Sequence, residues 1–145
     1  MKQEEKLQKA QLLTNTGLEQ ARGKEYPAAL VSFQTALRFF EELDETLYAA
    51  LVLGNIGSVY RDMDEHLLAM EAYQRALPLF EGVNNKEGMA DQYTNIAYIL
   101  VMQGDKKAAL AWYRKALPIY QKAEDQWKYE NTKRNIETLE GYGVQ

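Results

Sequence analysis

The sequence of 145 residues contains no cysteine and only one histidine, His66. Without cysteine there are no disulfide bonds, no thiol catalysis and no thiolate metal ligands, and a single histidine excludes a metal site built from several imidazoles. Three prolines and nine glycines are too few for a linker or a low-complexity protein. We therefore expect a folded chain that holds neither a metal nor a cofactor.

The sequence also lacks a long apolar run and a basic stripe. No run approaches the roughly 18 to 20 apolar residues that a membrane-spanning helix needs, and the first residues, Met1 to Lys6, lack the apolar core of a signal peptide. Acidic and basic residues are interspersed and the net charge is −4, so phosphates find no cluster of cations. These features predict a soluble, cytoplasmic protein that binds neither nucleic acid nor a membrane.

What the sequence does contain is one pattern that recurs at an interval of 40 residues. In the middle copy, a small residue and four helix-packing residues stand at Gly57, Ala69, Tyr73, Ala76 and Leu77. The other copies read Gly17, Ala29, Phe33, Ala36 and Leu37, and Ala97, Ala109, Tyr113, Ala116 and Leu117. Apolar residues recur at steps of three and four on both sides of a break, so each copy predicts two antiparallel helices joined by a tight turn.

The repeat predicts a single domain of three helix pairs and a final helix. The pairs cover about residues 7–45, 46–85 and 86–125, and the cap helix covers about residues 126–140. The seven helices are expected at about residues 4–22, 27–42, 46–62, 66–81, 87–102, 106–122 and 126–140. Glu137 stands where earlier copies have a small residue, which is typical of the polar cap that terminal repeats need. Between the first two pairs, Asp44 or Glu45 is expected to cap the next helix through its side chain.

The small residue, the alanines and the aromatic residue of each copy resemble the signature of the tetratricopeptide repeat (TPR) family. The common form has a period of about 34 residues, so this chain resembles the longer subtype of bacterial scaffold and signalling proteins and, more distantly, kinesin light chain. The resemblance implies an all-α fold, a right-handed α-α superhelix (solenoid). It also implies a non-catalytic scaffold that binds a protein or an extended peptide segment on a concave face lined by the first helix of each pair.

Asparagine recurs on this expected concave face at the repeat interval, at Asn15, Asn55, Asn95 and Asn135. A carboxamide offers a donor and an acceptor, so each asparagine is suited to bind the backbone of one residue of an extended peptide. In the alternative interpretation, these side chains bond only to neighbouring helices or water and hold the superhelix together. Steps of four, three and four along the first helices add further candidate peptide contacts: Leu18, Leu51, Ser58, Asp62, Asp91, Tyr98 and Met102.

Nothing in the sequence points to catalysis, because no glycine-rich phosphate loop, serine elbow or metal-ligand spacing is present. We assign His66 to packing or a turn. Asp62, Asp64 and Glu65 lack the glycine and the distal glutamate of a calcium loop, so they are interpreted as a solvated turn. Two alternatives to a peptide-binding module stay open: a self-associating structural module that forms homo-oligomers, and a regulatory fragment of a larger protein.

Overall fold

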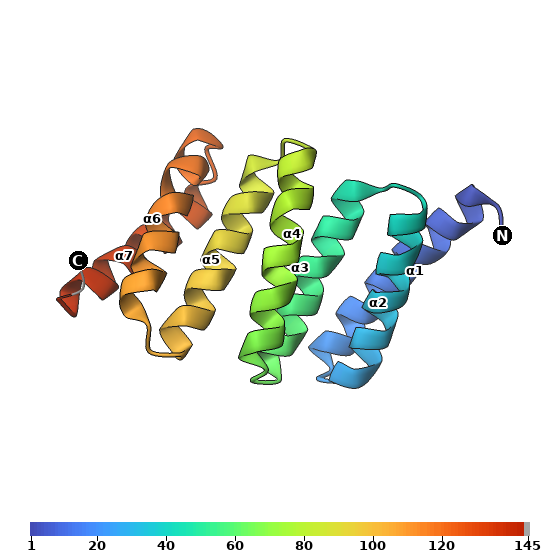
Figure 1. Ribbon diagram of the computed structural model, residues 1–145, viewed down its shortest axis with the longest axis horizontal. Helices are drawn as coiled ribbons and strands as arrows, with labels where there is room; N and C mark the ends of the chain where they lie inside the picture. The colour runs from blue at the N-terminus through green and yellow to red at the C-terminus, as the bar shows by residue number, and fades with distance from the viewer. Residues whose placement is uncertain (144–145) are drawn as a thin grey trace. The chain divides into compact units, whose positions relative to one another are not determined.

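The computed structural model describes residues 1–143, and in these residues the secondary structure consists of seven α-helices (Figure 1). They are α1 (Gln3–Arg22), α2 (Tyr26–Glu42), α3 (Thr46–Asp62), α4 (His66–Gly82), α5 (Lys86–Met102), α6 (Lys106–Lys122) and α7 (Gln126–Gly141). The predicted all-α class and the order of three helix pairs followed by one helix are confirmed. Each helix end lies within one residue of its predicted position.

The chain divides into two compact units, the first from Met1 to Val83 and the second beginning at Asn84. The first unit holds α1 to α4, and the second holds α5 to α7. The division falls in the turn between the second and third predicted helix pairs. The handedness of a superhelix and the grouping into a single domain depend on both units together, and they stay predictions.

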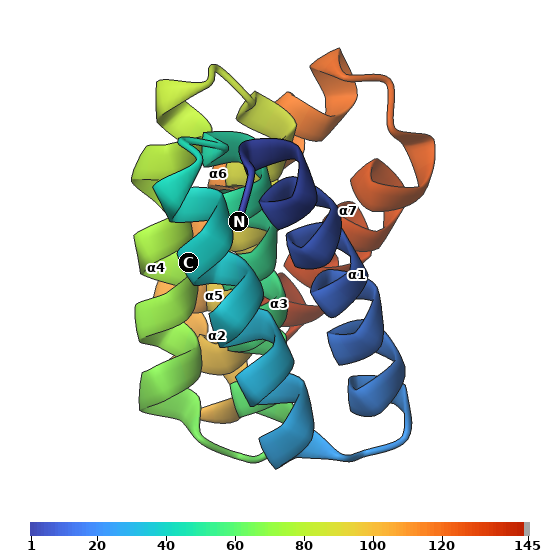
Figure 2. The same cartoon turned by 90° about the vertical axis from the view of Figure 1, so that its right-hand side faces the viewer.

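In the first unit, α1 packs on α2, α2 on α3, and α3 on α4. Figure 2 shows α1 and α3 on one side of this unit and α2 and α4 on the other. The repeated small residue explains how closely the helices of a pair approach each other. A Cβ atom added to Gly57 would lie 2.6 Å from Cε1 of Tyr73, and one added to Gly17 would lie 2.6 Å from Cε1 of Phe33. Glycine is therefore the residue that leaves room for the ring at both positions.

In the second unit, α5 packs on α6 and α6 packs on α7. The buried residues of its core cluster come from all three helices: Ala97, Ala109, Leu110, Tyr113, Ile136 and Leu139. Glu137 lies between Ile136 and Leu139 in the sequence of α7 and is exposed. This exposure agrees with the polar face predicted for the final helix.

Each of the six turns between helices places one residue at positive φ, in the left-handed region: φ lies between 54° and 61° at Lys24, Asp44, Asp64, Asn84 and Glu124, and is 86° at Gly104. The predicted capping role of Asp44 and Glu45 is wrong. Asp44 has this left-handed backbone, and Glu45 is the N-cap of α3 but makes no side-chain capping bond. The caps of α5, α6 and α7 do accept a backbone N–H, and they are the shorter Asn85, Asp105 and Asp125. A glutamate carries its carboxylate one methylene further from the backbone, which suits the cap position poorly.

Candidate functional site

In the first unit, a pocket of about 530 Å³ lies between α1 and α3. Its wall on α1 contains Gln11, Thr14 and Asn15, and its remaining residues are Phe40, Tyr48, Leu51, Val52 and Asn55. Three predicted peptide contacts, Asn15, Leu51 and Asn55, therefore line one pocket. The two asparagines are 40 positions apart in the sequence, and the packing of α1 against α2 and of α2 against α3 brings them to the same pocket.

The base of this pocket is apolar and aromatic. Phe40 is buried, and its ring stacks on Tyr48 with 5.2 Å between the ring centroids. Leu51 is 46% exposed, so its side chain is open to a ligand. The sequence analysis did not assign Phe40 and Tyr48 to the site. Tyr48 lies three residues before Leu51 on α3, so helical spacing could have found it, but spacing along α1 and α3 does not tell that Phe40 of α2 also lines the pocket.

The carboxamides of Asn15 and Asn55 are available for a ligand. Asn15 is exposed and Asn55 is half-buried. Within residues 1–143, neither side chain makes a hydrogen bond to another protein group. Among the described residues, these two asparagines therefore make no side-chain hydrogen bond to a neighbouring helix, and the structural interpretation stays open in its other form, bonds to water.

Ser58 and Asp62 are already in contact with other side chains of the first unit. The Ser58 hydroxyl lies 3.1 Å from the Tyr73 hydroxyl, and Arg61 Nε lies 3.2 Å from Oδ1 of Asp62. Burial raises the pKa of Tyr73, and the hydrogen bond between Tyr73 and Ser58 partly opposes that rise. Ser58 thus helps to hold the ring that packs on Gly57. Leu18 is half-buried and lies outside the pocket residues.

In the second unit, Asp91 belongs to an intramolecular network that the sequence did not predict. Lys128 Nζ lies 3.1 Å from Oδ1 of Asp91, and the Tyr120 hydroxyl donates to the same oxygen at 2.7 Å. Lys128 also lies 3.4 Å from Oε2 of Glu87. Partial burial lowers the pKa of Lys128, but the hydrogen bonds and charges of Asp91 and Glu87 outweigh it and raise this pKa overall.

The other candidates of the second unit are accessible to different degrees. Tyr98 is 48% exposed and Met102 is 43% exposed on α5. Asn95 is half-buried on the same helix, and Asn135 is exposed on α7. These side chains can contact a ligand of the second unit, and none of them belongs to the α1–α3 pocket that contains Asn15 and Asn55.

Two features that residues 1–143 lack bear on other functions. No group of three or more histidine, aspartate or glutamate side chains in this part of the chain is placed to hold a metal ion. Among the helices of the same residues, none has the length and apolar character needed to cross a bilayer.

The family is decided by a match to a protein-family model described as tetratricopeptide repeat, which covers residues 48–122, just over half of the chain. The chain belongs to the tetratricopeptide repeat family. The resemblance found in the repeated residues is thereby confirmed for this TPR chain. No curated protein matches it in sequence.

Several solved structures have the fold of this TPR chain. The apo form of RapI has a TM-score of 0.88 and 18% identity, over 95% of this chain and 38% of RapI. Aspartyl phosphate phosphatase F from Bacillus subtilis has a TM-score of 0.88 and 12% identity, over 92% of this chain and 35% of the phosphatase. The TPR domain of Arabidopsis FLU has a TM-score of 0.75 and 19% identity, over 81% of this chain and 98% of the FLU domain. This chain thus spans less than two-fifths of RapI and of the phosphatase.

Proposed function

We propose that this TPR chain is a non-catalytic scaffold module that binds an extended peptide segment of a protein partner in the pocket between α1 and α3. The proposal rests on one observation. The accessible carboxamides of Asn15 and Asn55 and the stacked rings of Phe40 and Tyr48 line the same pocket of about 530 Å³. The carboxamides supply a donor and an acceptor for peptide backbone, and the base supplies apolar surface for a side chain.

The spacing of the helices suits an extended chain. Adjacent packed helices lie about 8 to 10 Å apart, which corresponds to roughly three residues of extended peptide at about 3.3 Å each. A peptide that bonds to Asn15 and Asn55 through its backbone would place an intervening side chain against Leu51 and the stacked rings of Phe40 and Tyr48. We expect an aliphatic or aromatic side chain there, with loose sequence preference elsewhere.

In the second unit, Asn95, Asn135, Tyr98 and Met102 are proposed to offer further contacts to a peptide. Ser58 and Asp91, which have hydrogen-bond partners of their own, would contribute mainly by holding Tyr73 and Lys128. We also propose a cytoplasmic location, as the sequence predicts. No nucleic-acid or membrane partner is proposed, because a chain with net charge −4 repels surfaces rich in phosphate.

The test begins with peptides selected from a displayed random library on the purified chain, followed by calorimetry with the selected peptide. One neutral hydrogen bond contributes about 0.5 to 1.5 kcal/mol net. Asn15→Ala or Asn55→Ala alone should therefore weaken binding by about twofold to twelvefold, and both changes together should weaken it by the product of the two factors. Gln34→Ala, which removes an exposed carboxamide of α2 outside the pocket, is the matched control.

If the double variant keeps its helical circular dichroism spectrum and its full affinity, the α1–α3 pocket is not the binding site. The partner would then bind another face, and the asparagines would have a role in the free protein.

A further inference from the structure

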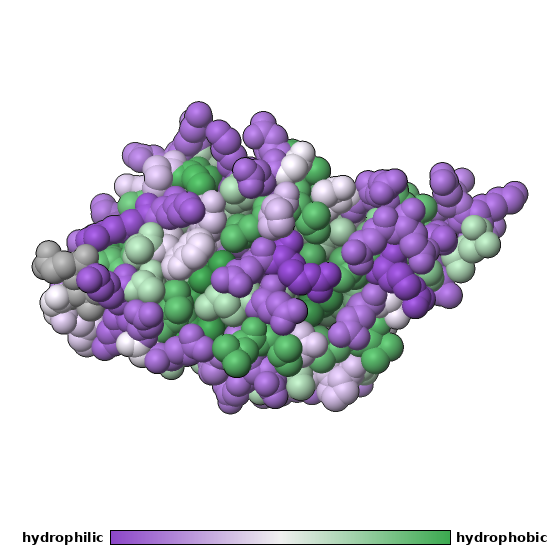
Figure 3. Space-filling model, viewed as in Figure 1, coloured by the Kyte–Doolittle hydropathy of each residue, from purple (hydrophilic) through white to green (hydrophobic). Residues whose placement is uncertain are grey.

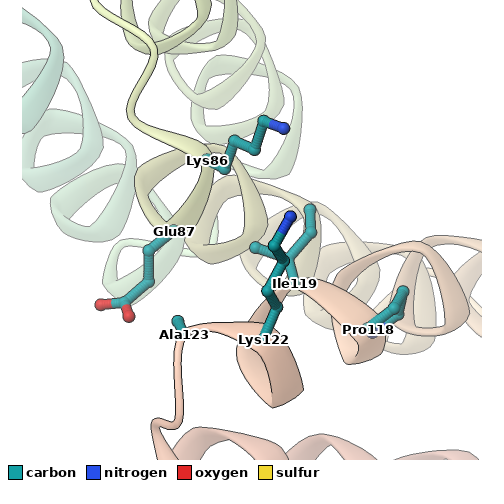
Figure 4. A pocket seen from close by; sticks show the side chains of 6 residues that line it. All are labelled: Lys86, Glu87, Pro118, Ile119, Lys122 and Ala123. Carbon is teal, nitrogen blue, oxygen red and sulfur yellow. The ribbon is translucent and has the colours of Figure 1, made fainter.

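A second pocket, of about 380 Å³, lies in the second unit between the start of α5 and the end of α6. Pro118, Ile119 and Ala123 supply its apolar surface, and Lys86 and Lys122 flank it. Figure 4 shows both ammonium groups directed to the same side of this pocket. The pocket thus combines a small apolar surface with two neighbouring positive charges, in a chain whose net charge is −4.

The first helix pair shows what can face a lysine at this place. Lys86 and Lys122 occupy the positions that Lys6 and Glu42 occupy in the first helix pair, two repeat intervals earlier. There, Lys6 Nζ donates to Oε2 of Glu42 at 2.9 Å. In the third pair, a lysine stands in place of that glutamate, so the carboxylate of the first pair is replaced by a second positive charge.

The neighbouring carboxylate does not compensate these two charges. Glu87 is directed away from both ammonium groups, as Figure 4 shows, and lies 3.4 Å from Lys128. Within residues 1–143, neither Lys86 nor Lys122 forms an ion pair. Two like charges at one pocket repel each other, and a carboxylate bound between them would relieve that repulsion.

We propose that this pocket binds a short acidic peptide segment, with its carboxylates at Lys86 and Lys122 and an aliphatic side chain on Ile119 and Pro118. The carboxylates would take the place that the Glu42 carboxylate has beside Lys6 in the first pair. A volume of 380 Å³ lies at the small end of the roughly 300 to 1,000 Å³ of ligand pockets, which suits one side chain of a peptide. An anionic membrane is the less suitable partner, because the whole chain is negatively charged.

The pocket shares no residue with the α1–α3 pocket, so this inference can be tested independently of the proposed function. The probe is a blocked peptide of sequence glycine-glutamate-leucine-glutamate-glycine, titrated into the ¹⁵N-labelled full chain and followed by two-dimensional NMR. We expect chemical-shift changes centred on the amides of Lys86, Ile119, Lys122 and Ala123. Because exposed ion pairs are screened by ions, the affinity should fall as salt is raised.

Variants of the peptide and of the protein separate the binding of carboxylates by the two lysines from the contact of the aliphatic side chain. Replacing both glutamates of the peptide by glutamine, or its leucine by serine, should weaken binding in either case. The double variant Lys86→Gln, Lys122→Gln should weaken binding of the original peptide by about threefold to thirtyfold. The matched control Lys107→Gln, Lys133→Gln removes the same net charge from exposed positions outside the pocket and should change binding by less than about twofold.

Three outcomes would overturn the proposal. The first is shift changes scattered over the surface, and the second is equal weakening by the two double variants. The third is preference for another kind of anion, shown by equal saturation of the same amides by inorganic phosphate or by tighter binding to vesicles of anionic lipid than to the peptide.

Discussion

At the scale of single residues, the contact between Gly57 and Tyr73 shows how the lack of a Cβ atom allows α3 and α4 to pack closely. The ring lies where a Cβ would stand, and both residues are buried. The first pair repeats this contact with Gly17 and Phe33. The third pair has Ala97 there, so the second unit accommodates one methyl group at the equivalent contact.

Replacing Gly57 by leucine should destabilise the fold. The larger side chain meets the Tyr73 ring, and overpacking a core typically costs about 1 to 3 kcal/mol. Thermal and urea unfolding measure the loss. Gly82→Ala is the control, because a Cβ on Gly82 meets no atom within 4 Å, and alanine should leave stability equal or slightly higher. An unchanged melting midpoint for Gly57→Leu would contradict the packing argument.

The burial of Tyr113 should make the folded protein less stable in alkali. Burial raises the pKa of Tyr113 from 10.0 to about 12, and the charge of Tyr98 adds to that rise. The unfolded chain therefore loses this proton at lower pH than the folded chain does. The raised pKa of Tyr113 therefore contributes fully to the unfolding free energy below pH 10, and this contribution falls as the pH rises from 10 to about 12.

Between pH 8 and pH 11, Tyr113→Phe should therefore lose about 1 kcal/mol less unfolding free energy than the wild type. Phenylalanine is a suitable replacement because Phe33 holds the same repeat position in the first pair. Urea unfolding at the two pH values measures the difference. Equal losses in the two proteins would show that this ring is not protected from ionisation.

At the scale of elements, α7 is attached to the second unit by apolar packing at its end and by charges at its start. Ile136 and Leu139 belong to the core cluster. Lys128, near the start of the helix, lies 3.1 Å from Asp91, 3.4 Å from Glu87 and 3.8 Å from Asp125. Partial exposure of these groups screens the interaction, so its contribution is smaller than its geometry suggests.

Lys128→Gln should lower the unfolding free energy by about 1 kcal/mol and speed amide hydrogen exchange at the start of α7. Lys133→Gln, at an exposed position of the same helix, should stay within about 0.5 kcal/mol of the wild type. In 1 M salt the difference between the two variants should shrink, because screening weakens the network. A difference that does not change with salt would mean that packing, rather than charge, holds this end of α7.

At the scale of the whole molecule, exposed apolar residues keep self-association open as an alternative function. Leu67, at the start of α4, is 80% exposed. Figure 3 shows hydrophobic atoms at this end of α4, on the face where α2 and α4 lie. Leu68 and Met63 near it are exposed as well, with the exposed Glu65 and Glu71 close by in sequence, and exposed apolar residues are normal on monomers.

We expect a monomer, so the mass from light scattering should stay near 16.7 kDa as the protein concentration rises. A mass that rises with concentration would favour the self-associating module, and Leu67→Glu should then reverse the rise. That the chain is a regulatory fragment of a larger protein stays a hypothesis.

The sequence by itself determined the helices, their pairing and the family. Apolar steps of three and four are local properties of a helix, and the recurrence of Gly17, Gly57 and Ala97 shows which faces must approach closely. The resemblance to the TPR family, together with the spacing along each helix, predicted that Asn15 and Asn55 face the same side, and both line the same pocket.

Only the tertiary structure decided which side chains of different helices meet. Phe40 and Tyr48 close the α1–α3 pocket, Lys128 binds Asp91 across 37 positions of the sequence, and Lys86 and Lys122 flank one pocket. Periodicity places a residue on a face of its own helix, but a contact between helices depends on their distance and rotation and on the lengths of the side chains involved. Those quantities are set by packing of the whole unit, which no local pattern contains.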